Sequence, residues 1–220
     1  MSIASNLLSI KNNLPEHVTL VAVSKTKPVS DLMEAYNAGQ RIFGENKIQE
    51  MTEKWEQMPK DIQWHMIGHV QTNKVKFMAE YVSLIHGVDS LKLLQEINKQ
   101  AQKHSRVIDC LLQIHIAQEE TKFGFDEQEL EILFNSNEFQ AMKNIRIVGL
   151  MGMATFTENQ NQVKQEFTHL KAIFDTIKIQ SVPTLAFTTL SMGMSGDYKL
   201  AIDCGSTMIR VGSSIFGGRI

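Results

Sequence analysis

The sequence alternates short apolar or β-branched runs with longer segments whose apolar residues recur at helical spacing, and this alternation continues from end to end. Apolar runs bounded by turn residues are typical of strands buried on both faces, as in parallel sheets. Strands that alternate with helices indicate repeated β-α units. We expect eight strands, at residues 18–24, 41–44, 62–67, 82–86, 107–116, 145–150, 184–187 and 208–211.

Eight repeats without an evident reversal favour an α/β fold of the closed (β/α)8 TIM-barrel type. An open doubly wound sheet is the alternative. The length of 220 residues lies near the lower end for such barrels, which run from roughly 200 to over 400 residues. Because no low-complexity linker or change in composition divides the chain, we expect one domain over residues 1–220.

Capping residues predict where several helices begin. Ser30, after Pro28, is expected to cap the first helix that follows a strand, and Ser90 a later one. Thr157 and Gln160 have the spacing of a capping box ahead of a long amphipathic segment.

Composition excludes several classes of protein. A hydrophobic content of 43%, a charged content of 21% and a net charge of -2 are ordinary for a globular domain. Without a basic cluster we expect no nucleic-acid partner. No apolar stretch reaches the roughly 18 residues of a membrane span, and the N-terminus lacks the pattern of a secretory signal. We therefore expect a cytoplasmic protein with no membrane contact, in which Cys110 and Cys204 are buried free thiols.

Lys25 follows the first apolar run directly, so we expect it at the carboxyl end of the first strand. Barrels and other parallel sheets bind their ligands at this end. A partly desolvated lysine amine can lose its proton near neutral pH and form a Schiff base with a carbonyl compound. A solvated loop lysine is the alternative interpretation.

Small and hydroxylated residues follow the last two predicted strands, where barrels most often build a phosphate site. They include Ser191 after the seventh strand, and Gly212 and Ser213 after the eighth. Backbone N–H groups of small residues can approach phosphate oxygens closely, and serine hydroxyls add donors. Together with Lys25, these loops predict a site for a phosphorylated carbonyl compound.

Four other features have two interpretations each. Arg210, in an apolar strand, needs either an acidic partner across the barrel or a bound ligand. Asn46 could contact a ligand or cap a helix that begins at Lys47. The glycine-containing run 149–154, which includes Met151, lacks dinucleotide spacing, so we expect a strand end packed near the ligand. His65 and His69 lie four residues apart but flank a glycine at a strand end, so we expect no metal site.

Motifs in order along almost the whole chain resemble one family, the pyridoxal phosphate homeostasis proteins, also called the YggS or PROSC family. The motifs are Ala22–Thr26 (AVSKT), Phe43–Glu50 (FGENKIQE), Trp64–Gln71 (WHMIGHVQ), Lys122–Gly124 (KFG), Gly149–Met151 (GLM), Leu190–Ser195 (LSMGMS) and Gly205–Gly212 (GSTMIRVG). The residues after Met151 differ, since relatives often carry a proline-containing loop there.

This resemblance implies a barrel of the alanine racemase N-terminal type that holds pyridoxal 5′-phosphate (PLP) as a Schiff base. Lys25, rather than Lys27, would form the Schiff base. The phosphate would be held by Ser191 with the backbone after it, by Gly212 and by Ser213. Arg210 would face the pyridine nitrogen, and Asn46 and Met151 are assigned to the same cofactor site.

Two arguments favour binding without robust catalysis. A fixed positive charge on Arg210 at the pyridine nitrogen would disfavour its protonated form and weaken PLP as an electron sink. Racemisation also needs a second acid/base group, which related racemases take from an additional domain that 220 residues leave no room for. Of the three tyrosines, only Tyr198 falls in a predicted mouth loop.

We therefore expect a monomeric protein without catalytic residues that buffers PLP and passes it to apo PLP-dependent enzymes. A small PLP-dependent amino-acid racemase is the alternative. A barrel enzyme that acts on a phosphorylated sugar through a lysine Schiff base is a third hypothesis.

Overall fold

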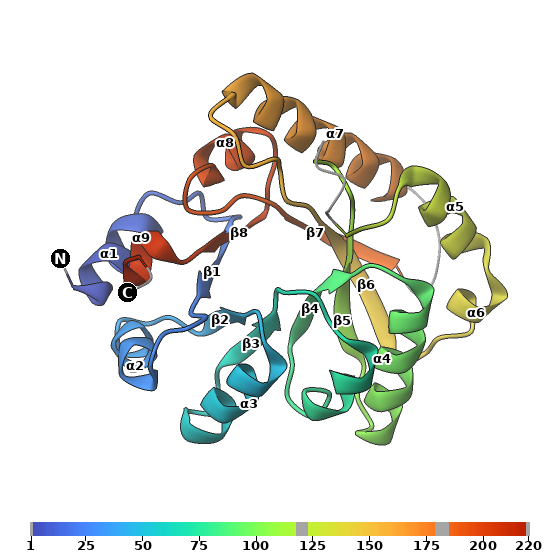
Figure 1. The fold of residues 1–220 in the computed structure, drawn as a ribbon, viewed down its shortest axis with the longest axis horizontal. Coiled ribbons are helices and arrows are strands. Elements are labelled where there is room, and N and C mark those ends of the chain that lie inside the picture. Colours follow the sequence, from blue (N-terminus) through green and yellow to red (C-terminus); the bar gives the residue numbers. More distant parts are fainter. Residues whose placement is uncertain (1, 118–122, 179–184, 219–220) are drawn as a thin grey trace.

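The eight predicted strands form a closed barrel in which every neighbouring pair is parallel and the strands follow in chain order (Figure 1). The computed structural model describes residues 2–117, 123–178 and 185–218. Pairing of Thr19 with Met208 and of Ala22 with Val211 closes the barrel between the first and last strands. The strands are β1 (Thr19–Val23), β2 (Ile42–Glu45), β3 (Gln63–Met66), β4 (Leu84–Val88), β5 (Ile108–Gln113), β6 (Ile145–Met151), β7 (Leu185–Ser191) and β8 (Met208–Val211). The predicted fold class is thus confirmed.

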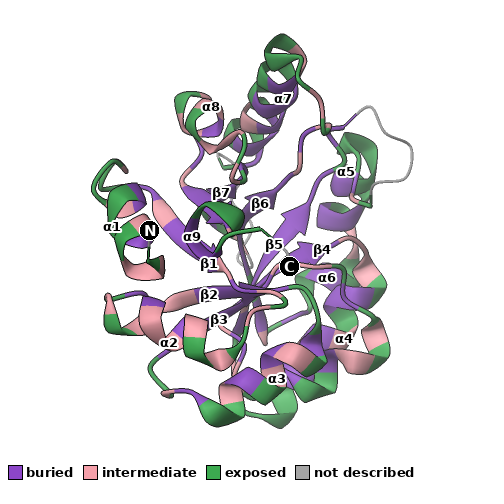
Figure 2. Cartoon of the chain, turned by 60° about the vertical axis from the view of Figure 1, so that its left-hand side comes forward, coloured by how far each residue is buried: buried purple, intermediate pink, exposed green. Residues whose placement is uncertain are grey.

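Helices surround the barrel and turn their apolar faces toward it, while their outer faces are exposed (Figure 2). They are α1 (Ile3–Lys11), α2 (Val29–Asn37), α3 (Ile48–Gln57), α4 (Leu91–Lys103), α5 (Glu127–Asn135), α6 (Asn137–Gln140), α7 (Gln160–Lys178), α8 (Tyr198–Asp203) and α9 (Ser213–Phe216), with a 3₁₀ helix, η1 (Thr72–Phe77), between β3 and β4. Within the described residues, none of these helices is both long and apolar enough to cross a membrane.

One of the three predicted helix starts is confirmed. The Ser90 hydroxyl accepts a hydrogen bond from the Leu93 N–H at the start of α4. The prediction for Ser30 is wrong, because α2 already begins at Val29, with Pro28 in the extended conformation before it.

The capping box predicted at Thr157 is also wrong. The chain turns once more before the helix, so that the Thr157 hydroxyl accepts from the N–H of Asn159. Asn159 in turn accepts from the Gln162 N–H at the start of α7, which begins at Gln160.

The largest error in the strand bounds concerns β7, which was predicted to end at residue 187 and continues to Ser191. Its last residues pair with β6, Thr189 with Gly149 and Ser191 with Met151. The polar threonines hid this extension, since they resemble the start of a loop. The first predicted residue, Thr184, lies outside the described residues.

Two apolar clusters hold the barrel together. The larger lies between the strands and the surrounding helices and includes the fully buried side chains of Phe43, Trp64 and Phe167. The smaller fills the barrel interior, with Val21, Leu84, Leu111, Val148, Met151 and Met208. Burying one such side chain stabilises the fold by roughly 1.5–3 kcal/mol. Because the interior is packed, a ligand can enter only at an end of the barrel.

Both cysteines are free thiols. Cys110 is buried in β5 as expected, and burial raises the pKa of its thiol. Cys204 is only half-buried, in contrast to the prediction. It directly follows the short helix α8, and its sulfur accepts a hydrogen bond from the Thr168 hydroxyl at 3.9 Å.

Candidate functional site

A cavity of about 710 Å³ opens where the carboxyl ends of the strands meet. Five of the seven predicted site residues line it, namely Lys25, Asn46, Arg210, Gly212 and Ser213. They lie in or just after β1, β2 and β8, and β1 pairs with both β2 and the distant β8 in the closed barrel. Barrel closure therefore gathers most of the predicted site into one cavity.

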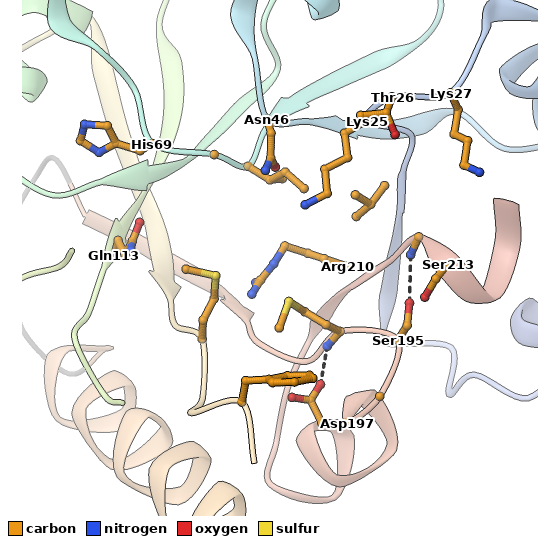
Figure 3. Close-up of a pocket in the computed structure, with 18 of the residues that line it drawn as sticks. Lys25, Thr26, Lys27, Asn46, His69, Gln113, Ser195, Asp197, Arg210 and Ser213 are labelled. Carbon is orange, nitrogen blue, oxygen red and sulfur yellow. Dashed lines mark hydrogen bonds between the residues drawn. The ribbon is translucent and has the colours of Figure 1, made fainter. Parts of the chain in front are cut away.

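Lys25 lies two residues after the end of β1, and its amino group points into the cavity (Figure 3). Lys27 lies at the rim, where its ammonium group donates a hydrogen bond to the Gly218 carbonyl at 2.9 Å. Lys25 and Lys27 thus point in different directions, and Lys25 is the one that faces Arg210 across the cavity (Figure 3).

Arg210 is buried at the floor of the cavity and is held by three hydrogen bonds. Its guanidinium group donates to the carbonyl of Ser191 at 2.9 Å, to the Ser191 hydroxyl at 2.6 Å and to the carbonyl of Gly152 at 3.0 Å. Burial lowers the pKa of Arg210 to about 10, against the opposing effect of Asp197. The group is therefore still charged at neutral pH.

An acidic partner across the barrel, one of the two interpretations of Arg210, is not found among the described residues, where carbonyls and a hydroxyl accept its N–H groups. These acceptors compensate part of the cost of burying a guanidinium group. They leave one edge of the group toward the cavity that it lines.

A chain of hydrogen bonds continues from Arg210 through the barrel interior. The Ser191 hydroxyl lies 3.2 Å from Nδ1 of His86, whose Nε2 lies 3.0 Å from Nδ1 of His65. Since arginine can only donate, the Ser191 oxygen accepts from Arg210. With the His86 proton on Nε2, the Ser191 hydroxyl donates to His86 and His86 donates to His65, whereas the other tautomer reverses both directions.

Two of the predicted site residues, Ser191 and Met151, are not among the described residues that line the cavity. Ser191 is fully buried beneath the cavity, and its hydroxyl is engaged by Arg210 and His86. Met151 packs in the apolar interior cluster. Because β7 is longer than predicted, the loop that reaches the cavity starts later, and Ser195 lines the cavity in place of Ser191. Met153 does so in place of Met151.

Ser195 joins the two loops that were predicted to bind phosphate. Its hydroxyl accepts a hydrogen bond from the Gly212 N–H at 3.2 Å (Figure 3). A Cβ atom on Gly212 would lie 2.9 Å from the Val23 carbonyl oxygen, so only glycine fits without a shift. The loops after β7 and β8 are thereby held side by side at one wall of the cavity.

Asn46 also lines the cavity, directly after β2. The alternative interpretation as a helix cap is not supported, because α3 begins at Ile48 with Lys47 at the capping position. Gly68 packs against the Asn46 backbone, where an added Cβ would lie 2.6 Å from the Asn46 carbonyl oxygen.

The sequence analysis missed the outer rim of the cavity. Nδ1 of His69 lies 3.0 Å from a carboxylate oxygen of Asp89, and its ring stacks on Phe123. Phe123 and Phe156 are exposed aromatic residues at this rim. Phe123 belongs to the KFG motif, whereas an isolated aromatic residue in a loop, such as Phe156, gives no distinctive sequence signal. Lys122, in the KFG motif, lies outside the described residues.

Comparison with known proteins shows the family to which this chain belongs. The whole chain, residues 1–220, matches the alanine racemase N-terminal domain family. A pyridoxal phosphate homeostasis protein from Pasteurella multocida is 38% identical, with 100% of this chain and 98% of the relative covered. The protein of that name from Synechocystis is 39% identical, with 94% of each chain covered.

Solved structures agree with the sequence relatives. PipY of Synechococcus elongatus, with PLP bound, has a TM-score of 0.90 at 35% identity, and 98% of this chain and 100% of PipY are covered. An alanine racemase from Clostridium difficile has a TM-score of 0.77 at 16% identity, with 99% of this chain and 60% of the racemase covered, which shows a shared fold. The chain therefore belongs to the alanine racemase N-terminal domain family and, within it, to the pyridoxal phosphate homeostasis proteins.

Proposed function

We propose that this protein binds PLP at the barrel mouth through a Schiff base with Lys25 and serves intracellular PLP homeostasis without robust catalysis of its own. One observation carries this proposal. A lysine amine and an arginine guanidinium point into one cavity whose wall is made of two loops rich in glycine and serine (Figure 3). The PLP-bound structure of PipY and the names of the curated relatives support it.

The residues of the cavity fit a phosphorylated aromatic aldehyde. Lys25 supplies an amine, while Ser195 and Ser213 supply hydroxyl donors beside Gly212. The one carboxylate in these loops, Asp197, accepts the N–H of Met194 at 2.5 Å and is thereby engaged within its own loop. In place of the earlier assignment of Ser191, we assign the phosphate to Ser195, Ser213 and the backbone at Gly212, with Asn46 at the side of the ring.

When bound, PLP supplies an electron sink, whose strength depends on a proton at its pyridine nitrogen. Arg210 is charged at neutral pH and is held rigidly at the cavity floor. A fixed positive charge beside the pyridine nitrogen disfavours that proton. In this proposal Arg210 holds the ring in place and keeps its reactivity low.

The tyrosines also favour binding over catalysis. All three are described by the structure, and none lines the cavity. Tyr36 donates to Asp61 on the surface, Tyr81 stacks on Trp55, and Tyr198, at the start of α8, packs against the core. The cavity thus offers no tyrosine that could serve as the second acid/base group of a racemase.

We further propose that the protein acts in the cytoplasm as a monomer and passes PLP to apo PLP-dependent enzymes. Neither a nucleic acid nor a membrane is a partner in this proposal. The cavity mouth is rimmed by exposed side chains such as Phe123 and Phe156. A mouth of this kind lets an incoming amine reach the cofactor.

The test is the visible absorption spectrum of wild type and Lys25→Ala after addition of PLP, before and after borohydride. We expect a band in wild type only, removed by borohydride, with the reduced cofactor on the peptide that contains Lys25. Absence of the band in wild type would overturn the PLP assignment. Lys25-dependent racemisation of amino acids at a rate far above that of free PLP would overturn the non-catalytic role. It would favour the alternative of a small racemase, whose fold this chain shares.

A further inference from the structure

The backbone just after Lys25 is strained. Thr26 has a φ of +66°, a left-handed conformation that is unfavourable for a β-branched residue. Such a conformation persists only where the surrounding structure imposes it, and it is found preferentially at functional sites. Contacts with neighbouring residues must therefore hold Thr26 in this conformation.

Glu50, on α3, holds Thr26 directly. The Thr26 N–H donates a hydrogen bond of 2.6 Å to Oε1 of Glu50. The same oxygen accepts from the ammonium group of Lys54 at 2.7 Å, one helical turn further along. The charge-assisted bond and the ion pair together keep the carboxylate aimed at the strained residue.

Lys54 binds the residue that precedes Lys25 in the chain. Its ammonium group donates to the carbonyl of Ser24 at 2.8 Å and to Oε1 of Glu45 at 2.8 Å. The Ser24 hydroxyl donates to the same Glu45 oxygen at 2.5 Å. All three protons of the Lys54 ammonium group thus have acceptors, and the residues before and after Lys25 are bound to one cluster.

Two members of the cluster of Glu45, Glu50 and Lys54 are buried, with Lys54 5% and Glu45 0% exposed, and Glu50 is half-buried. The arrangement of these charged groups has two energetic costs. Within the part of the chain that the structure describes, Oε2 of Glu45 is buried without a hydrogen-bond partner, and burial raises the pKa of this carboxyl group. An apolar contact between α3 and the barrel would avoid both costs.

We propose that Glu50 and Lys54, with Glu45, are positioning residues that hold Lys25 in the direction required for attack on a carbonyl group. They act through the backbone of Ser24 and Thr26. This inference rests on the proposed function in one respect, namely that the carbonyl compound attacked by Lys25 is PLP. A misplacement of about 1 Å can cost about 100-fold in rate, so rigid support of Lys25 would have a measurable effect.

The test compares wild type, Glu50→Ala, Thr26→Gly and the double variant. The control is Asp175→Ala, which removes an exposed ion pair of the same spacing, Lys171–Asp175 on α7. The readout is the rate at which borohydride-trapped adduct appears on the Lys25 peptide, with PLP and separately with pyridoxal, which lacks the phosphate. Thermal unfolding of each variant without ligand is measured in parallel.

We expect Glu50→Ala to lower both trapping rates about tenfold, less than the roughly 100-fold that a 1 Å misplacement can cost. The control should react like wild type. Glycine adopts the left-handed conformation without strain, so Thr26→Gly should restore most of the rate in the Glu50→Ala background. A purely structural role of Glu50 would change the unfolding temperature without this rescue.

Wild-type trapping rates in Glu50→Ala would overturn the inference, as would a failure of Thr26→Gly to raise the rate of a folded double variant. If Glu50→Ala does not fold, Glu50→Gln takes its place, because the amide keeps an acceptor for Thr26 and loses the ion pair with Lys54. A wild type that traps pyridoxal in a Glu50-dependent manner but not PLP would refute the proposed cofactor and leave the positioning role standing.

Discussion

The histidine pair inside the barrel makes the stability of this protein sensitive to mild acid. His65 and His86 are buried and 3.0 Å apart between ring nitrogens. Burial lowers the pKa of His65 to about 3. Burial, then His65 and Arg210, lower the pKa of His86 well below its usual value. Both side chains are therefore neutral in the folded protein at neutral pH.

The direction of the effect follows from proton binding in the two states. Between the pKa of an unfolded histidine, about 6.5, and the folded pKa of His65, about 3, the unfolded chain binds more protons. The stability contributed by neutral His65 is complete above pH 6.5 and is lost as pH falls toward 3. Lowering the pH from 7.5 to 5.0 should cost about 2 kcal/mol through His65, and His86 adds to this in the same direction.

Urea unfolding at pH 7.5 and 5.0 measures this loss in wild type and His65→Gln. Glutamine retains hydrogen-bonding capacity toward His86 but does not titrate. We expect wild type to lose about 2 kcal/mol more than the variant on acidification. Carboxyl groups such as Glu45, whose raised pKa acts in the opposite direction, are present in both proteins and cancel in the difference. Exposed His104 provides the matched control substitution, His104→Gln. Equal losses in wild type and His65→Gln would refute the reasoning.

Two further predictions concern the strands that support the site. Gly149→Ala would place a Cβ atom 1.6 Å from the Thr189 carbonyl oxygen, where β6 meets β7. We expect a loss of roughly 3 kcal/mol or more in unfolding free energy, and an unchanged melting temperature would contradict it. Ser191→Ala removes the hydroxyl between Arg210 and His86. It should cost about 1–3 kcal/mol and weaken PLP binding in a spectroscopic titration, whereas unaltered binding would argue against support of Arg210 by Ser191.

The sequence contains most of the information about the elements of this fold. Strands buried on both faces appear as continuous apolar runs, and helices as apolar residues at helical spacing, so both are visible locally. Lys25 could be placed for the same reason, because it ends one of these runs. The order of the strands then places all carboxyl ends, and with them most of the candidate site, at one mouth.

Errors arose where a strand or helix ends. β7 continues to Ser191 because β6 offers partners for its last residues, and the threonines themselves give no sign of this. The four additional residues move Ser191 from a loop into the barrel interior and bring Ser195 to the cavity. Helix starts at Pro28 and Asn159 were missed for a similar reason, since several neighbouring residues could cap a helix.

The sequence by itself thus determined the fold class, the family and the end of the barrel that carries the site. Only the tertiary structure decided which polar side chains are buried together. The Ser24, Glu45 and Lys54 contacts join three separate segments, and Ser191 meets His86 across 105 positions of sequence. Such contacts depend on the register and closure of the barrel, whereas sequence patterns report only on neighbours along the chain.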